Sequence, residues 1–218
     1  MFIGHFATGL AAKKVARKPS LGTLFLAAQF IDLLWPLLLL LGLEAVAVDP
    51  HNTVVTPLNF IDYPISHSLL GVALWGLFFG LIYYLIKRDV KSAVWLGLLV
   101  ISHWVLDFFT HRPDLPLAPG PNAIKVGLGL WNSLAGTLLL ELGLFAAGSY
   151  LYLSVTKAKN KIGVWAFWTF IAFLLLMYVI NIFGPPPPAD PQTIGWAGMA
   201  QWLLIAWGYW IDRNRDAS

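Results

Sequence analysis

Cysteine is absent from the 218-residue sequence. Without a thiol, the chain cannot form a disulfide, a thiolate zinc site or a cysteine nucleophile. A transition-metal site would therefore have to use histidine nitrogen and carboxylate oxygen as its ligand atoms.

Charge is also scarce, since 11% of the residues are charged and 58% are hydrophobic. Soluble domains carry about 25% charged residues. The composition therefore predicts an integral membrane protein, and its length fits a single domain over residues 1–218. Eleven tryptophans and seven tyrosines suit the aromatic belts found at membrane interfaces.

Long apolar segments make up most of the sequence and predict an all-α, polytopic helical bundle. Most are close to the roughly 20 residues that cross a bilayer. Pro36 is expected to kink the first segment. The six predicted transmembrane helices cover residues 21–43, 65–86, 93–110, 128–153, 164–183 and 194–211.

The distribution of basic residues predicts the orientation of these six segments. If the N-terminus is cytoplasmic, all fourteen Lys and Arg residues except Arg112 and Lys125 fall on the cytoplasmic side. Cytoplasmic loops of membrane proteins carry an excess of basic residues. The pattern therefore predicts a multi-pass protein with both termini in the cytoplasm, and topology accounts for the net charge of +3 without nucleic acid.

The N-terminal residues 1–18 form a separate feature, in which an apolar run precedes a basic cluster. A secretory signal has the opposite order. Eight residues separate His5 from Lys13, which corresponds to about 12 Å of helix in a hydrocarbon core about 30 Å thick. We therefore expect a short re-entrant half-helix over residues 1–12 that carries His5 toward the membrane midplane, followed by a basic turn.

Ionisable residues inside the apolar segments are candidates for function, because a charge there costs at least about 2.5–3.5 kcal/mol on insertion scales. Asp32 lies in the first segment, His103 and Asp107 in the third and Glu141 in the fourth. His67 opens the second at its outer end. Glu141 could either support a site or form a structural pair.

Helical spacing links three residues of the third segment. His103, Asp107 and His111 occupy positions i, i+4 and i+8, and neighbours four apart lie on one helical face about 6 Å apart in rise. His103 and His111 are then about 12 Å apart in rise and cannot easily share one ion. Asp107 could bind one ion with His103 or bridge to a second with His111. Pro113 should end the helix near Arg112.

Each of these residues also has a purely structural interpretation. His67 alone could be a hydrogen-bonded structural histidine, Asp32 could pair with a tyrosine or tryptophan, and His103 and Asp107 could form a buried pair. His51, in an outer loop, is expected to be solvated. The interpretation as a metal site gains support because four of the five histidines lie in or beside the apolar segments, and two have an aspartate in helical register.

Several short motifs together resemble a known family. They are Gly4-His5, the mid-segment Asp32, SHS at residues 66–68 and SHxxxD at residues 102–107. The series resembles bacterial inner-membrane, metal-dependent hydrolases of the YdjM-like type, which are distantly similar to zinc-dependent phospholipase C. It covers roughly residues 1–114. The metal ligands implied by this resemblance are His5, Asp32, His67, His103 and Asp107.

The sequence departs from that family pattern in two places. The hydrolases carry an acidic motif of the form PDID where this chain has only Phe30-Ile31-Asp32, and they carry an arginine before the central histidine that is missing here. The motifs HRPDLPL, GLGLWNS and FGPPPP, at residues 111–117, 127–133 and 183–188, resemble uncharacterised bacterial membrane proteins and imply no function.

The leading hypothesis is a metal-dependent membrane hydrolase acting on a phosphoester, including a lipid-linked one. Zinc is the first choice of metal, with manganese or iron as alternatives. Asp107 or Asp32 would orient or deprotonate a water. His111 is predicted as an additional metal ligand. The residues predicted to attract or bind phosphate at the outer face are Arg112, Lys125, Asn132 and Ser133.

Two alternatives remain open from sequence. Intramembrane Asp32, His103, Asp107 and Glu141 could form the relay of a small permease or of an ion or proton carrier. A carrier needs polar groups toward both faces, whereas the cytoplasmic parts of the segments are apolar apart from His5. The second alternative is a non-catalytic structural membrane protein. The expected partners are membrane lipids and a lipid or phosphoester substrate.

Overall fold

The computed structural model describes residues 1–217 and is mostly helical, in agreement with the predicted fold class. Three short antiparallel strand pairs join the helices at the ends of the bundle. The helices are α1 (Ile3–Ala12), α2 (Leu21–Ala28), α3 (Phe30–Leu40), α4 (Pro64–His67), α5 (Leu69–Lys87), α6 (Val90–Thr110), the 3-10 turn η1 (Leu130–Asn132), α7 (Leu134–Ser154), α8 (Lys161–Phe183), α9 (Pro191–Met199) and α10 (Gln201–Arg213). The strands are β1 (Ala45–Val48), β2 (Leu58–Asp62), β3 (Leu115–Pro116), β4 (Lys125–Val126), β5 (Thr156–Ala158) and β6 (Arg215–Ala217), paired β1–β2, β3–β4 and β5–β6.

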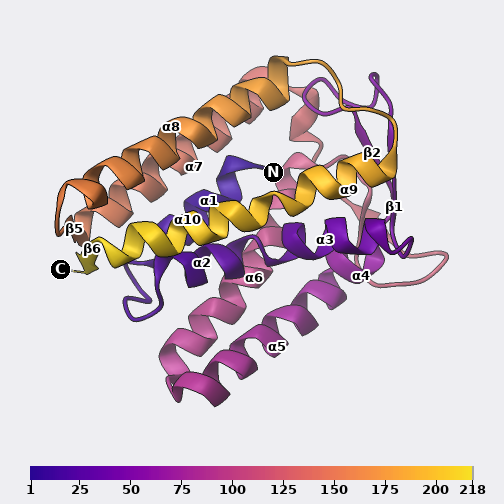
Figure 1. Ribbon diagram of the computed structural model, residues 1–218. Helices are drawn as coiled ribbons and strands as arrows, with labels where there is room; N and C mark the ends of the chain where they lie inside the picture. The colour runs from indigo at the N-terminus through magenta and orange to yellow at the C-terminus, as the bar shows by residue number, and fades with distance from the viewer. Residues whose placement is uncertain (218) are drawn as a thin grey trace.

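The helices run roughly along one axis, with α7 and α8 on one side, α5 and α6 on the other, and α2–α3 and α9–α10 between them (Figure 1). The C-terminus lies at one end beside β5 and β6, and β1 and β2 lie at the other end. The first residues of the chain lie in the interior rather than at either end.

Four helices, α5 to α8, are long and apolar enough to cross a membrane, and the bent pair α2 and α3 makes a fifth if it counts as one span. The prediction of six spans is not confirmed. The sixth predicted segment is divided at Ala200 into α9 and α10, which are 9 and 13 residues long. The hydropathy of the sequence could not show this division, because both pieces are apolar.

The bend in the first predicted span lies between α2 and α3 at Gln29 and measures 56°. Pro36, where a kink is expected from sequence, lies seven residues further along the chain, inside α3. Pro36 does have a local effect, because a proline has no N–H for the carbonyl four residues earlier. That carbonyl belongs to Asp32, and it accepts instead from Gln201 Nε2 at 3.4 Å.

The short helix α1 is enclosed by the bundle and packs mainly against α7, α2 and α6. The close approach to α7 is possible because residue 148 is glycine, where a Cβ would lie 2.4 Å from the Ala7 carbonyl oxygen. Glu141 of α7 accepts hydrogen bonds from Phe2 N at 2.9 Å and Gly4 N at 3.2 Å. Glu141 thus binds the start of α1, the structural role considered from sequence.

Aromatic side chains fill the bundle next to α1 on the side of the C-terminus. We call this group the phenylalanine cluster, and its members Phe6, Phe25, Phe167 and Phe170 have no solvent exposure. The ring centroids of Phe6 and Phe25 lie 5.2 Å apart, and those of Phe25 and Phe170 lie 5.3 Å apart. Such close aromatic packing fixes the positions of α1, α2 and α8 relative to one another.

Candidate metal centre

Five side chains from four helices meet beside the phenylalanine cluster, and we call them the His/Asp centre. His5 comes from α1, Asp32 from α3, His67 from α4, and His103 and Asp107 from α6. The structure therefore brings together the five residues that the family resemblance implied as ligands. All are buried except Asp32, whose side chain keeps 24% exposure.

Interruptions in the helices place two of these residues. Asp32 stands in the first turn of α3, just after the bend at Gln29. His67 is the last residue of α4, and Ser68 then turns the chain into α5, where its hydroxyl accepts from Gly71 N. Broken helices commonly line polar sites inside membrane proteins, because their ends expose polar backbone.

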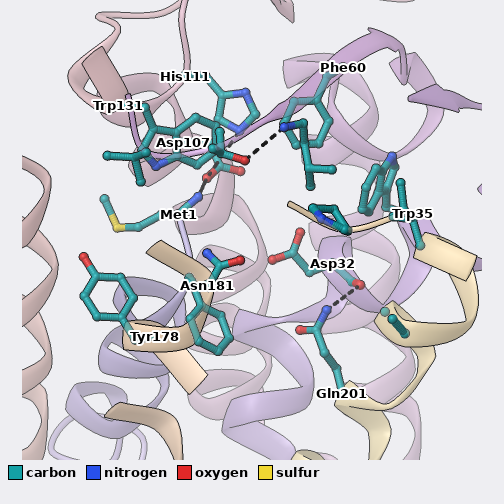
Figure 2. Close-up of a pocket in the computed structure, with 18 of the residues that line it drawn as sticks. Met1, Asp32, Trp35, Phe60, Asp107, His111, Trp131, Tyr178, Asn181 and Gln201 are labelled. Carbon is teal, nitrogen blue, oxygen red and sulfur yellow. Dashed lines mark hydrogen bonds and ion pairs between the residues drawn. The ribbon is translucent and has the colours of Figure 1, made fainter. Parts of the chain in front are cut away.

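Asp107 is within 4 Å of each histidine of the centre, and Figure 2 shows it with Asp32 at the cavity. Its Oδ2 lies 3.2 Å from His103 Nε2 and 3.9 Å from His67 Nε2. Its Oδ1 lies 3.1 Å from His5 Nε2 and 4.0 Å from His111 Nε2. The two carboxylate oxygens thus face different histidines, and Asp107 can bridge two groups of ligands.

Asp32 faces the same histidines from the opposite side. Its Oδ1 lies 3.5 Å from His103 Nε2 and 3.6 Å from His67 Nε2. Two overlapping groups could hold a metal ion, His5–His103–Asp107 and Asp32–His67–His103, with the ligand atoms of each within 4.8 Å of one another. His103 belongs to both groups, so the arrangement can serve one ion or a closely spaced pair.

Backbone chemistry fixes the orientation of His103. Its Nδ1 lies 2.9 Å from the Ala28 carbonyl oxygen, and because a carbonyl only accepts, Nδ1 must carry the proton. Neutral His103 therefore presents a lone pair at Nε2, a buried atom that has no hydrogen-bond partner within the described residues. This lone pair points toward the carboxylates of Asp32 and Asp107, which is the orientation of a metal-binding histidine.

His67 is oriented by a chain of hydrogen bonds that leads to Glu44. Ser66 donates from its hydroxyl to Glu44 Oε2 at 2.6 Å and from its backbone N–H to Oε1 at 2.8 Å. The hydroxyl oxygen lies 2.7 Å from His67 Nδ1 and accepts from it. His67 Nε2 is then left with a lone pair directed at Asp32 and Asp107. Burial raises the pKa of the Glu44 carboxyl.

His111 lies just outside the two ligand groups. It caps α6, which ends at Thr110, so the predicted helix end near Arg112 is confirmed. His111 Nδ1 lies 2.9 Å from Asp114 Oδ1, which also accepts from the Tyr63 hydroxyl at 2.9 Å. Burial alone would raise the pKa of the Asp114 carboxyl, but the hydrogen bonds from His111, Tyr63 and Arg112 hold it below its usual value.

A cavity of about 350 Å³ opens directly onto the centre. Asp32, His67, Asp107 and His111 form its polar end. The amino nitrogen of Met1 also reaches this end, 2.5 Å from Asp107 Oδ1 (Figure 2). The other walls include side chains that sequence reasoning did not select, namely Trp35, Phe60, Trp131, Tyr178, Asn181 and Gln201.

The four residues predicted to bind phosphate do not line this cavity. Arg112 donates from Nη2 to Asn59 Oδ1 at 2.5 Å and from Nε to Asp114 Oδ2 at 3.3 Å. Ser133 caps α7 by accepting from Gly136 N. The other two also lie away from the cavity walls, Asn132 at the end of η1 and Lys125 with its Nζ donating to the Ile61 carbonyl at 3.3 Å.

Comparison with known protein families places these residues in a family. The family model described as YdjM inner membrane protein matches residues 1–184. This range includes all five residues of the His/Asp centre and helices α1 to α8. No curated protein and no solved structure matches the chain.

Proposed function

The chain belongs to the YdjM inner membrane protein family, and we propose that it is a metal-dependent hydrolase that acts on a phosphoester. One observation carries the proposal. The hydrogen bonds at their Nδ1 atoms hold His67 and His103 so that both Nε2 atoms face the carboxylates of Asp32 and Asp107 at 3.2 to 3.9 Å. A divalent cation bound between these nitrogen and carboxylate oxygen atoms would have imidazole and carboxylate ligands whose orientation is already fixed by hydrogen bonds at Nδ1.

The donor set decides which metal fits. Imidazole nitrogen and carboxylate oxygen, without a thiolate, favour zinc, with manganese or iron as the alternatives. A divalent ion bound at such a site supplies Lewis acidity and lowers the pKa of a coordinated water.

The two aspartates have different tasks in this proposal. Asp32 lines the cavity and is the most exposed member of the centre, so its carboxylate is placed to orient or deprotonate an attacking water. Asp107 is enclosed by His5, His67 and His103, and it holds the ligand atoms in position. Gln201 supports Asp32 by donating to its backbone carbonyl.

The proposed setting is the bacterial inner membrane, with six spans and both termini in the cytoplasm. The distribution of basic residues supports this orientation. The bent pair α2 and α3 and the divided pair α9 and α10 would each be a broken span. In membrane proteins, irregular backbone at membrane depth occurs where it is buried or lines a cavity, and both breaks lie beside the His/Asp centre.

The packing of the bundle favours a hydrolase over an ion carrier. A carrier needs a polar path from the centre to both faces of the membrane. On the side of the C-terminus, the residue next to His5 is Phe6, and it packs against Phe25 and Phe170, all without solvent exposure. Next to His5, this apolar packing offers no polar path from the centre toward the C-terminal side, whereas the cavity reaches the centre from the other side.

Elemental analysis of the detergent-purified protein tests the metal site. We expect about one or two equivalents of zinc, manganese or iron per chain, with the metal lost in His103→Ala and Asp107→Ala while helical content is kept. His51→Ala is the matched control, because His51 is exposed and belongs to neither group of candidate ligands. A well-folded wild type that binds none of the three metals, even after reloading, would contradict the proposal. If metal is present, a screen of phosphoesters follows.

A further inference from the structure

The path of α9 determines how the cavity reaches the surface. α10 packs against α8 and α2, whereas α9 turns away at Ala200 and packs against α3. Two glycines permit this contact, because a Cβ at Gly195 would lie 2.8 Å from the Leu40 side chain and one at Gly198 would lie 2.5 Å from Pro36. The C-terminal part of α8 is therefore not covered by α9, as the separation of the two helices in Figure 1 shows.

The cavity fills the space between these two helices. Met177, Tyr178 and Asn181 of α8 form one wall, and Ile194 and Ala197 of α9 belong to the other. Met177, Asn181 and Ala197 are exposed, whereas Tyr178 is 2% exposed and lies deeper. The exposed residues mark a mouth between α8 and α9, and the partly exposed Asp32 lies at the inner end of the same cavity.

A second cavity of about 360 Å³ extends this mouth toward the loops at the end of the bundle. It shares Met177 and Asn181 with the first cavity and is bounded by residues 53–58 and prolines 185–187. The opening thus runs from the His/Asp centre along the side of α8 to the loops that are predicted to be outside the cell.

The surface around the mouth is strongly apolar. Val179, Ile180 and Phe183 of α8 and Trp196 of α9 are exposed beside it, and Leu203 of α10 is 71% exposed. A surface of this kind in a membrane protein faces lipid chains. The mouth therefore opens sideways into the bilayer as well as toward the outer loops.

We propose that the gap between α8 and α9 is a lateral portal for a phosphoester that carries a hydrocarbon chain. One chain would lie against Met177, Tyr178 and Ala197, and the phosphate would reach the centre at Asp32. A volume of about 350 Å³ is at the lower end of the range for small-ligand sites, about 300–1,000 Å³. It accommodates a head group with part of one chain, so the rest of the lipid stays in the bilayer.

Two polar side chains in the portal fit such an amphiphile. Asn181 projects into the cavity from α8, and Gln201 stands opposite beside Asp32 (Figure 2). Their amide groups can donate to phosphate or glycerol oxygens at the boundary between the chain and the centre. The apolar and polar parts of the lining thus match the two parts of the ligand. The role of the phosphate depends on the proposed function, whereas chain binding does not.

Photo-crosslinking tests the portal without requiring hydrolysis. The full chain is reconstituted in vesicles of phosphatidylethanolamine and phosphatidylglycerol that contain phosphatidylglycerol with a diazirine near the end of one acyl chain. After illumination, mass spectrometry locates the adducts. We expect adducts on buried Tyr178 and Trp35, which line the cavity. Adducts on lipid-facing Leu176 and Val179 should form in every sample and report successful reconstitution.

Variants separate the portal from the general lipid surface. Ala197→Trp should block the mouth and abolish the Tyr178 adduct, and Ala197→Leu is a milder obstruction if the tryptophan variant does not fold. Leu203→Trp is the matched control, since it adds the same side chain to the lipid-facing surface of α10. Adducts confined to Leu176 and Val179, or a Tyr178 adduct that persists in a folded, blocked variant, would overturn the portal.

The same experiment distinguishes failure of the portal from failure of the proposed function. A Tyr178 adduct in a protein that hydrolyses no phosphoester supports the portal and counts against the hydrolase. Hydrolysis of a phosphoester without any Tyr178 adduct overturns the portal and leaves the hydrolase in place. If both hold, Ala197→Trp should lower kcat/KM for a long-chain phosphoester more than for a short, water-soluble one.

Discussion

Two consecutive residues of α1 enter two different environments. His5 Nε2 lies 3.1 Å from Asp107 Oδ1 in the His/Asp centre, whereas Phe6 packs in the phenylalanine cluster with its ring centroid 5.2 Å from that of Phe25. Both side chains have no solvent exposure. Burial alone therefore does not distinguish a functional region from a structural one. The two regions differ in the atoms that they bury. The cluster buries apolar rings, whereas the centre buries ring nitrogens within 4 Å of carboxylate oxygens.

The two regions are also built on different backbone. The phenylalanine cluster lies within continuous turns of α1, α2 and α8, whereas the His/Asp centre lies beside the breaks at Gln29, Ser68 and Ala200. The breaks release carbonyl groups that continuous helices would use internally. One of them, on Ala28, accepts from His103 and fixes its orientation. An interrupted helix therefore loses some of its internal backbone hydrogen bonds, and the backbone groups that are released can orient the candidate metal ligands.

The largest expected effect concerns Asp107, because it contacts every histidine of the centre. Asp107→Asn keeps the shape of the side chain and removes its charge. We expect loss of bound metal and about a thousandfold loss of phosphoester hydrolysis, or about 4 kcal/mol, with the helical content kept. Asp216→Asn is the matched control, since Asp216 is exposed and far from the centre. Full activity in Asp107→Asn would remove Asp107 from the mechanism.

The opposite pattern is expected for the phenylalanine cluster. Phe170→Ala removes a fully buried ring that packs on Phe6 and Phe25, which should lower the free energy of unfolding by about 3–5 kcal/mol. Metal content per folded chain should not change. Phe173→Ala, on the same helix but 37% exposed, should cost less. Denaturation in detergent measures both. Loss of metal without loss of stability would show that the two regions are not separable.

Local features of both regions could be predicted from the sequence. The helical period placed His103 and Asp107 on one face, and their Nε2 and Oδ2 atoms lie 3.2 Å apart. Pro113 indicated the end of α6 correctly. Family membership was predicted from short motifs, and the family match confirms it. These predictions succeeded because each depends on residues that are close together in the sequence or on a pattern of residue types.

Features that depend on where helices bend could not be predicted in the same way. An apolar segment does not reveal a break at Ala200, so six spans were expected. Glu44 and Gln201 join the site only through tertiary contacts, without any spacing that links them to the histidines. Ser133 was chosen as a phosphate ligand, although a serine directly before an apolar run also signals a helix N-cap, the role it has here.

An intermediate effect is expected where Glu44 orients His67 through Ser66. Ser66→Ala removes the acceptor for His67 Nδ1, and Glu44→Gln weakens the hold on Ser66. Each should reduce metal affinity about 10–100-fold, measured by competition with a chelator. Ser102→Ala is the matched control, because Ser102 also precedes a histidine of the centre but donates to Leu99 O in its own helix. Equal affinities of Ser66→Ala and Ser102→Ala would contradict the role of Ser66.

The smallest effect is expected for Ser133, which we place outside the functional region. Ser133→Ala removes the N-cap of α7, which should lower the free energy of unfolding by about 1 kcal/mol and leave kcat and KM of the folded enzyme unchanged. Ser154→Ala, at the other end of α7, removes a hydroxyl that donates to Leu151 O and serves as the matched control. A raised KM with unchanged stability would instead assign Ser133 to phosphate binding. The functional region would then extend beyond the cavity walls to the start of α7.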